Sequence, residues 1–402
     1  MSKWEWKKLG EVAEIVGGST PKTGVEEYWN GKNIWITPAE IGRDLFLNDS
    51  VRHISDAAVK SANLKLMPAG TVILSSRAPI GKLAISNVPF YCNQGFKNAI
   101  CGDLLNNKFL FFYLLSSTAE LESLGKGTTF KEISKTIVEN IPVPVPPLSE
   151  QKHIVKFLDN EFSKIDTLKT NAETNLKNAK ELFESTLEKE LNPGKNGTLP
   201  SGWEWKALRE LCILRPPKNE ALSHLKGTDE VSFLPMEDLN IRERNTIPHK
   251  SRALSEVHGS YTFFAEGDVL LAKVTPCFEN GKMGVASNLL NGVGFGSSEY
   301  IVFRTTKSMI NSYLFYVLMS SRFISGGKKQ MLGACGLKRL SKEYVESFQI
   351  PLPPLSVQKE IVARLDKLSE NVKRLEANYK QIIANCDELK KSILKKTFEG
   401  ES

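Results

Sequence analysis

The chain has 402 residues, of which 41% are hydrophobic and 25% are charged, and this balance excludes an intrinsically disordered protein. Its length exceeds what a single core usually organises, so we expect two domains with connecting elements. The formal net charge of +7 excludes a strongly acidic protein and favours, without proving, a polyanionic partner.

The N-terminal segment carries a motif that returns in the second half of the chain. Trp4–Glu11 recurs as Trp203–Glu210, and we expect Trp4 and Trp203 to anchor cores. The segment lacks the apolar stretch of a signal peptide, and no run of about 18 apolar residues occurs anywhere. The six cysteines are scattered without metal-site spacing. We therefore expect a cytoplasmic protein with reduced thiols, no metal site and no membrane span.

Each half next contains short apolar strands and a buried helix. Thr71–Leu74, Asp268–Leu271 and Tyr300–Phe303 are short runs of β-branched and apolar residues, which predicts β-strands. The aromatic run Phe109–Ser117 recurs as Tyr313–Ser321 and indicates one buried helix in each half. We therefore predict two mixed α+β domains, without assigning a strand order.

A long helix follows the first globular half. Pro147 ends the preceding element, and Ser149 is suited to cap the start of a helix. Apolar residues then recur in alternating steps of three and four, interrupted at Lys169, which is the period of a coiled-coil seam. The predicted seam of this helix comprises Leu158, Phe162, Ile165, Ala172, Leu176, Ala179 and Phe183.

The second half ends in a matching helix, because Pro146–Lys152 recurs as Pro353–Lys359. Each helix has one narrow apolar stripe that needs a partner helix. We expect the other helix of the same chain to be that partner; the alternative is a coiled coil that joins two copies of the chain. The predicted seam of the second helix comprises Leu365, Leu368, Val372, Leu375, Tyr379, Ile382 and Leu389.

These patterns divide the chain into five parts. We predict a first domain over residues 1–147, a first long helix over 148–192 and a linker over 193–202. A second domain over 203–354 and a second long helix over 355–402 complete the chain. The predicted fold class is α+β, with two tandem α/β domains separated and joined by two long antiparallel coiled-coil helices. Antiparallel packing would relate the duplicated halves by a pseudo-two-fold axis.

Several local motifs, in a constant order, resemble the signatures of one protein family. They are Gly17–Lys22, Tyr28–Trp29, Ile34–Ile41, Ser75–Gly81, Asn93–Lys97, Leu199–Trp203 and the two Pro-Pro-Leu-Ser helix starts. Over nearly its whole length, the chain resembles the specificity (S) subunit of type I restriction-modification systems, the HsdS family.

The resemblance implies a division of labour among subunits. The globular halves would be target-recognition domains, each reading one half of a bipartite asymmetric site in double-stranded DNA, while the helices set the length of the unread spacer. Two modification (methyltransferase) subunits would dock around the helices, and restriction/translocase subunits would join them. The resemblance places S-adenosylmethionine, ATP and Mg on the partner subunits, with no cofactor bound by this chain.

The second half departs from the family pattern. Lys273–Pro276 stands where the first half has Ser76–Pro79, and Gly296–Glu299 stands near the place of Asn93–Phe96. Base contacts therefore cannot be transferred residue by residue between the halves. Such a difference is also what two unequal half-sites would require.

Polar and basic loop residues are the predicted DNA contacts. Phosphate contacts need Lys and Arg, whereas base edges are read by groups such as Arg, Asn, Gln and Ser. The run Gly125–Lys131 combines glycines, hydroxyls and cations that suit close approach to phosphate, and Gly333–Arg339 is its counterpart. The predicted contacts in the first half are Lys22, Arg43, Arg77, Lys82, Asn93, Gln94, Lys97, Thr128, Thr129 and Lys131. Those in the second half are Arg242, Arg244, Lys250, Arg252, Lys273, Lys282, Ser297, Ser298, Lys328, Lys329, Lys338 and Arg339.

Catalytic motifs are missing from the sequence. Arg215–Lys218 lacks the Asn and aromatic residue of an adenine methyltransferase motif, and Gly292–Gly296 has no clear strand-turn-helix context. The five histidines form no metal or triad signature. We therefore predict a non-catalytic DNA-recognition subunit with no catalytic or metal-binding residues. The alternatives are an enzyme whose chemistry the motifs do not reveal, a coiled-coil scaffold that binds only protein, and an orphan bipartite DNA-binding protein without a restriction partner.

Overall fold

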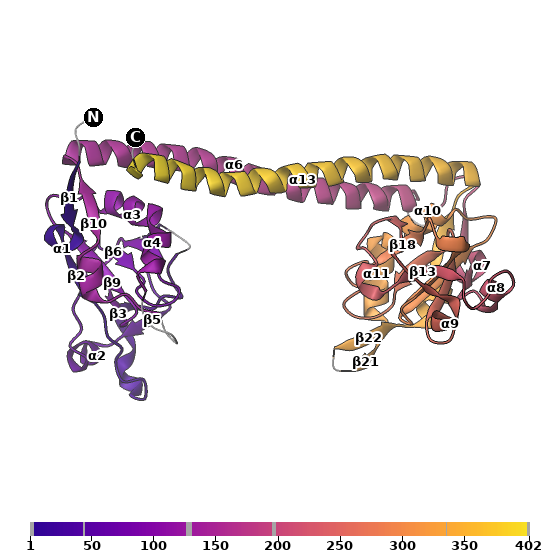
Figure 1. Cartoon of the computed structure of the whole chain (residues 1–402), viewed down its shortest axis with the longest axis horizontal. Helices are drawn as coiled ribbons and strands as arrows, with labels where there is room; N and C mark the ends of the chain where they lie inside the picture. The colour runs from indigo at the N-terminus through magenta and orange to yellow at the C-terminus, as the bar shows by residue number, and fades with distance from the viewer. Residues whose placement is uncertain (1–3, 43–44, 126–130, 195–197, 335, 400–402) are drawn as a thin grey trace. The chain divides into compact units, whose positions relative to one another are not determined.

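The computed structural model describes residues 4–42, 45–125, 131–194, 198–334 and 336–399. The chain divides into two compact units. Residues 1–173 and 381–402 form unit 1, and residues 174–380 form unit 2. Each long helix therefore contributes one part to each unit. Figure 1 shows that each unit has its own sheets and short helices.

Unit 1 contains a five-stranded sheet of order β2-β9-β6-β7-β4, a three-stranded sheet of order β5-β3-β8 and a two-stranded ribbon of β1 and β10. The predicted strand over residues 71–74 is confirmed as β6, and the predicted aromatic helix as α3. The elements are β1 Glu5–Lys8, α1 Leu9–Val12, β2 Ala13–Gly17, η1 Glu26–Tyr28, β3 Trp29–Ile36, β4 Phe46–Leu47, β5 Arg52–Ile54, α2 Asp56–Ser61, β6 Val72–Leu74, β7 Leu83–Ser86, β8 Tyr91–Cys92, β9 Lys97–Cys101, α3 Asn107–Ser116, α4 Thr118–Ser123, α5 Lys135–Glu139, β10 Pro142–Val145 and the first part of α6 Leu148–Leu191.

Unit 2 repeats this arrangement. Its five-stranded sheet has the order β12-β20-β17-β18-β14, which matches the sheet of unit 1 strand for strand, and a second sheet has the order β15-β13-β19-β16. Strands β11 and β23 pair as β1 and β10 do, and β21 pairs with β22. The elements are β11 Glu204–Ala207, α7 Leu208–Leu211, β12 Cys212–Leu214, α8 Asn219–Leu222, β13 Glu230–Leu234, η3 Met236–Asp238, β14 Asn245–Thr246, β15 Lys250–Ala253, α9 Leu254–Val257, β16 Thr262–Ala265, β17 Val269–Ala272, β18 Met283–Ala286, η4 Leu290–Gly292, β19 Val293–Gly296, β20 Tyr300–Thr305, α10 Asn311–Met319, α11 Ser321–Lys329, β21 Met331–Ala334, β22 Leu337–Leu340, α12 Lys342–Ser347, β23 Gln349–Leu352 and α13 Leu355–Glu399.

The aromatic helix α3 forms the centre of unit 1. Its residues from Phe109 to Leu114 are all buried, because one side of α3 covers the sheet at β6 and β7 and the other meets the long helices (Figure 1). Phe109 and Tyr113 pack edge-on against Phe398 of α13, with ring centroids 5.4 and 5.5 Å apart. The apolar side chains of α3 therefore join the globular part of unit 1 to its coiled coil.

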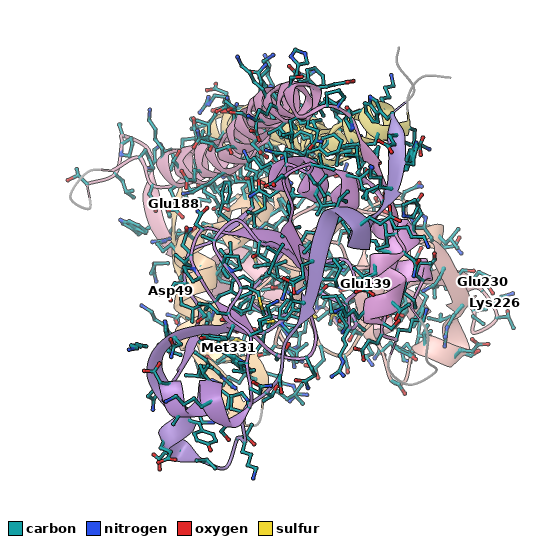
Figure 2. All side chains as sticks on the ribbon, turned by 90° about the vertical axis from the view of Figure 1, so that its left-hand side faces the viewer. Asp49, Glu139, Glu188, Lys226, Glu230 and Met331 are labelled. Atoms are coloured by element: carbon teal, nitrogen blue, oxygen red, sulfur yellow. The ribbon has the colours of Figure 1, made fainter. Side chains whose placement is uncertain are left out.

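At the surface of unit 1, Asp49, which is labelled in Figure 2, carries an Oδ1 atom that lies 2.9 Å from His53 Nε2.

Gln151 explains the repeated Pro-Pro-Leu-Ser motif, which it follows in α6. Its side chain is fully buried, and its Oε1 accepts a hydrogen bond from the backbone N–H of Asn106 at 2.8 Å. Its Nε2 donates to the carbonyls of Leu104 and Pro146 at 2.9 and 2.8 Å. The buried amide thereby satisfies backbone groups just before α3 and fixes where α6 begins relative to α3.

The two long helices pair in opposite directions within each unit. In unit 1, Lys169 of α6 bonds Asp387 of α13 at 2.7 Å, and Phe398 near the end of α13 packs beside the first turns of α6. In unit 2, the end of α6 meets the beginning of α13, where Glu190 pairs with Arg364 at 2.6 Å. These contacts confirm the predicted antiparallel coiled coil, and the apolar seam is filled within one chain.

The prediction of the seam is wrong at two positions. Leu375 and Leu389 are 38% and 47% exposed, although the other predicted seam residues are buried or half-buried. At the second of these positions the next residue faces the partner helix instead, because Lys390 Nζ lies 5.0 Å from the centre of the Phe162 ring. A lysine stem covers apolar surface while its charge stays in water, so a charged residue can occupy a seam beside an aromatic ring.

Candidate nucleic-acid interface

A cluster of three charged side chains lies at one end of the central sheet of unit 1. The Nε of Arg77, in the loop after β6, bonds Glu132 Oε2 at 2.9 Å, and Lys97 Nζ at the start of β9 lies 3.3 Å from Glu132 Oε1. Burial acts to raise the pKa of Glu132, but the hydrogen bonds from Arg77 and Lys97 hold that pKa below its ordinary value. The carboxylate is therefore ionised at neutral pH and holds two predicted DNA-contacting cations together.

The loop that carries Arg77 is closed by its own side chains. Ser75 Oγ donates to the carbonyl of Pro79 at 2.8 Å and accepts from the backbone N–H of Lys82 at 2.8 Å. Lys82 Nζ donates to the carbonyl of Pro38 at 2.9 Å, so the structure gives this predicted DNA contact a role inside the unit. These hydrogen bonds fix the backbone conformation of the loop that carries Arg77.

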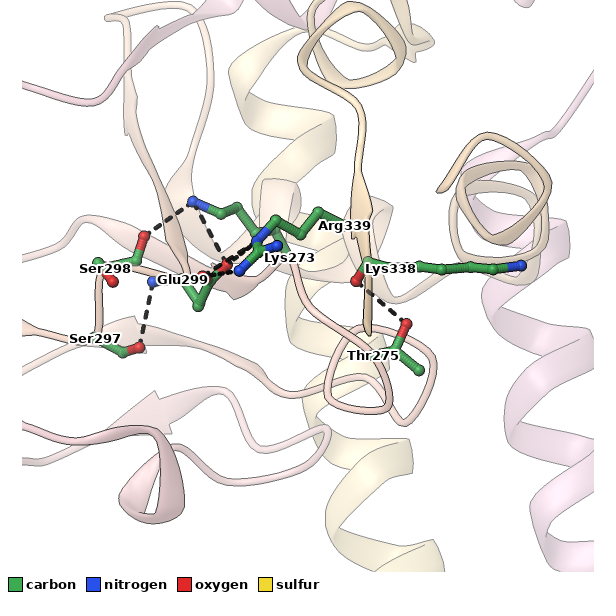
Figure 3. A network of polar contacts seen from close by, with 7 residues as sticks. All are labelled: Lys273, Thr275, Ser297, Ser298, Glu299, Lys338 and Arg339. Atoms are coloured by element: carbon green, nitrogen blue, oxygen red, sulfur yellow. Dashed lines mark hydrogen bonds and ion pairs between the residues drawn. The ribbon is translucent and has the colours of Figure 1, made fainter. Parts of the chain in front are cut away.

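Unit 2 contains a corresponding cluster around Glu299, which precedes β20 (Figure 3). Arg339 of β22 bonds both oxygens of Glu299 through Nε and Nη2, at 2.8 to 3.2 Å. Lys273 Nζ donates to the carbonyl of Ser298 at 2.9 Å and lies 3.7 Å from Glu299 Oε2. The hydrogen bond from Arg339 lowers the pKa of Glu299, and burial lowers the pKa of Lys273.

The loop before β20 has a turn of its own. Ser297 Oγ accepts a hydrogen bond from the backbone N–H of Glu299 at 3.2 Å, as Asn93 Oδ1 accepts from the N–H of Gly95 at 2.9 Å in unit 1. An open hollow of about 410 Å³ adjoins this loop, and its lining includes Arg215, Lys218, Lys273 and Ser298. The structure thus adds cations that sequence reasoning missed beside residues that it predicted.

The remaining predicted contacts in unit 1 are dispersed. Gln94 Oε1 accepts from the Thr20 hydroxyl at 2.6 Å, which ties two predicted loops together. Lys22 and Lys131 are exposed. Arg43, Thr128 and Thr129 lie outside the described residues. Among the described residues, the structure brings the predicted contacts Arg77 and Lys97 into one cluster through Glu132.

Two predicted cations of unit 2 contact the long helices instead of the polar loops. Arg244 Nη1 bonds Asp366 of α13 at 2.8 Å, and Asp366 also accepts from the Tyr316 hydroxyl at 2.6 Å. Arg242 forms an ion pair with Glu184 of α6. These carboxylate contacts give both arginines a role in attaching the globular part of the unit to its coiled coil, which does not favour their predicted role at DNA.

Other predicted cations of unit 2 have partners within their own domain. Lys250 bonds Asp238 at 2.8 Å, and Lys282 Nζ donates to the carbonyl of Met236 at 2.8 Å. The guanidinium of Arg252 lies 4.3 Å from the centre of the Phe233 ring. Lys328, Lys329 and Lys338 are exposed near the hairpin of β21 and β22.

Glu132 and Glu299 are the cluster residues that sequence reasoning missed. Cations and neutral polar groups are the side chains expected at DNA, because a carboxylate repels phosphate. Glu132 directly follows the predicted Lys131, and Glu299 directly follows the predicted Ser298. Glu132 directly follows the motif Gly125–Lys131 and Glu299 ends the motif Gly296–Glu299, and these positions were the signal that would have found them.

Among the described residues, no group of three or more His, Cys, Asp or Glu side chains could hold a metal ion. No described helix is long and apolar enough to cross a membrane.

Comparison with known proteins places the chain in a family. A family model described as the type I restriction modification DNA specificity domain matches residues 1–178 and 200–384. The MjaIX type I restriction enzyme specificity subunit of Methanocaldococcus jannaschii is 33% identical over 230 residues, which cover 54% of this chain and 53% of that relative. The matched stretch thus spans about half of that relative's length. The MjaVIII specificity subunit of the same organism is 24% identical over 99% of this chain and 92% of its own length.

Solved structures show the same fold. One chain, from work on complex assembly and conformational transition of the type I R-M system, has a TM-score of 0.76 at 21% identity, covering 100% of this chain and 99% of that one. The HsdS subunit from Thermoanaerobacter tengcongensis has a TM-score of 0.62 at 21% identity, covering 100% of this chain and 98% of that one. With matching domain repeats, long helices and family motifs, the chain belongs to the type I restriction modification DNA specificity domain family.

Proposed function

We propose that this chain is the DNA-sequence-specificity subunit of a type I restriction-modification enzyme. One observation carries the proposal: the five-stranded sheets of the two globular domains have the same strand order, but the domains place different charged residues on their corresponding loops. A shared scaffold with different surfaces is suited to reading two different base sequences. Each domain reads one half of a bipartite asymmetric site, and the paired helices set the length of the unread spacer.

The chemistry of the enzyme belongs to partner subunits in this proposal. Two modification subunits carry S-adenosylmethionine and methylate adenine, and restriction/translocase subunits use ATP and Mg. The chain itself positions these partners on DNA in the cytoplasm and performs no catalytic step. Family membership supports this non-catalytic role over a hidden enzyme activity or a scaffold that binds protein alone.

The long helices offer the docking surface for the modification subunits. Large apolar side chains are exposed on α6 and α13, and we assign them to the contact with the modification subunits. They are Leu148, Phe157, Leu168, Leu182, Leu355, Leu375 and Leu389.

The decisive experiment expresses the chain with the modification subunits of its own system and sequences the methylated adenines in cellular DNA. The expected result is one motif with two defined parts and a spacer of constant length. A gel shift of the same assembly with this duplex, in competition with heparin, separates sequence-specific binding from binding to any polyanion. Methylation at one continuous motif, or equal competition by heparin and an unrelated duplex, would contradict the proposal.

A further inference from the structure

The two charged clusters have the same composition and the same graded exposure. Each contains one arginine, one lysine and one glutamate. Arg77 and Arg339 are 45% and 47% exposed, whereas Lys97 and Lys273 are only 13% and 15% exposed. Each domain therefore presents one half-exposed guanidinium beside an inner lysine, with a carboxylate between them.

The arginines and glutamates of the two clusters do not come from equivalent positions. The backbone bridge between Arg77 and Glu132 in unit 1 corresponds to the bridge between Val274 and Arg339 in unit 2. By this correspondence, an apolar residue stands where unit 1 has its arginine, and an arginine stands where unit 1 has its glutamate.

The lysines and the second glutamate differ in the same way. The hydrogen bond from Ser76 N to Gly95 O, at 2.8 Å, corresponds to that from Lys273 N to Glu299 O, at 2.9 Å. Serine and glycine thus stand in unit 1 where unit 2 has its lysine and glutamate. In unit 1, Lys97 directly follows Phe96, which forms a backbone bridge with Ser75. In unit 2, Tyr300 takes the place of Phe96, so the apolar residue after it, Ile301, takes the place of Lys97. Simple duplication does not produce the same trio at non-equivalent positions, so its presence in both domains indicates a shared task.

The chemistry of the trio is that of an oriented guanidinium. Arg77 bonds its carboxylate through Nε, and the terminal nitrogens of an arginine form the fork that matches guanine O6 and N7. Arg339 uses Nε and Nη2 on Glu299, so that Nη1 carries further N–H donors. The inner lysine offsets the negative charge that would otherwise face the phosphates of DNA.

We propose that Arg77 and Arg339 each read a guanine in one half-site, and that Glu132 and Glu299 are positioning residues that hold these guanidinium groups at the groove. The inference rests on the proposed function, which it deepens by naming one base-reading residue in each domain. It assigns the carboxylates to base selection and not to binding strength.

The test uses the chain assembled with its modification subunits and two pools of duplex DNA. Each pool carries the methylated motif with one half-site randomised, and bound sequences are selected and sequenced. Arg77→Lys keeps the charge and removes the fork, so we expect the preference for guanine at one position of the first half-site to fall about tenfold or more. Preferences in the second half-site stay unchanged, and Arg339→Lys gives the reverse pattern.

The carboxylates are tested by Glu132→Gln and Glu299→Gln. We expect each to lower the same guanine preference while binding to unrelated DNA stays equal or becomes tighter, because one negative charge is lost. A merely structural role would instead weaken binding at all positions of the site equally. Glu139→Gln is the matched control, since the exposure of Glu139 is similar to that of Glu132 and its ion-pair partner is Lys135 of α5, which is not part of the cluster. Glu346→Gln is the corresponding control in unit 2, because Glu346 pairs with Lys342 of α12.

The possible failures are distinguishable. If wild type selects two defined half-sites but no variant changes any guanine preference, the assignment of the clusters is overturned while the proposed function stands. A uniform loss of affinity for every sequence would identify the arginines as phosphate contacts and also overturn the assignment. If wild type selects no motif, the proposed function fails and the inference fails with it.

Discussion

Gln358 in α13 accepts a hydrogen bond through Oε1 from the backbone N–H of Ile310 at 2.9 Å. Its Nε2 donates to the carbonyls of Ser308 and Pro353, both at 2.9 Å, and the side chain is fully buried. Gln151 does the same in unit 1, so both long helices begin at a buried amide that binds the chain before the aromatic helix. The relationship explains why the same motif opens both helices.

Gln358→Leu should therefore destabilise unit 2. The substitution leaves a buried N–H and two carbonyls without a side-chain partner, and we expect the free energy of unfolding to fall by about 3 kcal/mol. Urea unfolding followed by circular dichroism measures this change. Gln381→Leu, at an exposed position of the same helix, is the control and should change the free energy by less than about 0.5 kcal/mol. Equal stability of both variants would show that the amide contributes nothing.

A heptad inserted into both long helices should lengthen the spacer of the DNA site. Seven residues add about 10 Å to a helix, which corresponds to about three base pairs of B-DNA. The insertions belong after Glu173 and after Lys380, the positions along each helix at which the residues of one unit end and those of the other begin. Sequencing of methylated DNA gives the spacer, and both half-sites should stay unchanged. An insertion into α6 alone breaks the register and should abolish methylation; an unchanged spacer in the double insertion would contradict the role of the helices.

Leu389→Asp should weaken assembly with the modification subunits without unfolding the chain. Leu389 is exposed, so its replacement should change the free energy of unfolding by less than about 0.5 kcal/mol. We expect the dissociation constant of the complex to rise at least about tenfold, because a buried interface leucine would be replaced by an unpaired charge. Analytical ultracentrifugation measures the complex. Ala384→Asp, also exposed but turned by about 140° around α13, is the control; equal loss with both variants would argue against a defined docking face.

The ion pair of Glu299 should contribute stability only at higher pH. The hydrogen bond from Arg339 holds the pKa of Glu299 below its ordinary value of 4.5, so the folded state favours the ionised carboxylate. The contribution is fully present above pH 4.5 and is lost as the pH falls through the lowered pKa.

Melting temperatures of wild type and Glu299→Gln, measured between neutral and acidic pH, check this prediction. The difference between the two should shrink as the pH falls. Glu346→Gln corrects for the loss of one negative charge outside the cluster. A difference that stays constant down to acidic pH would show that the carboxylate gains nothing from its partners.

The sequence alone determined the duplication, the two long helices, the family and the strands that became β6, β17 and β20. These features are written in local patterns, because helix caps, heptad steps and apolar runs act over a few residues. The seam was predictable to within one residue: Leu389 and Lys390 are adjacent, and the ring of Phe162 on the other helix decided which one faces inward.

Only the tertiary structure decided which charged residues meet. Arg77 and Glu132 are 55 residues apart, and Arg339 and Glu299 are 40 apart. A charge in a sequence does not reveal its partner, because pairing depends on which strands lie side by side. For the same reason Arg244, predicted at DNA, was found bound to Asp366 of a long helix. Local periodicity thus encodes the elements of this protein, whereas contacts between distant strands and helices assign its polar side chains.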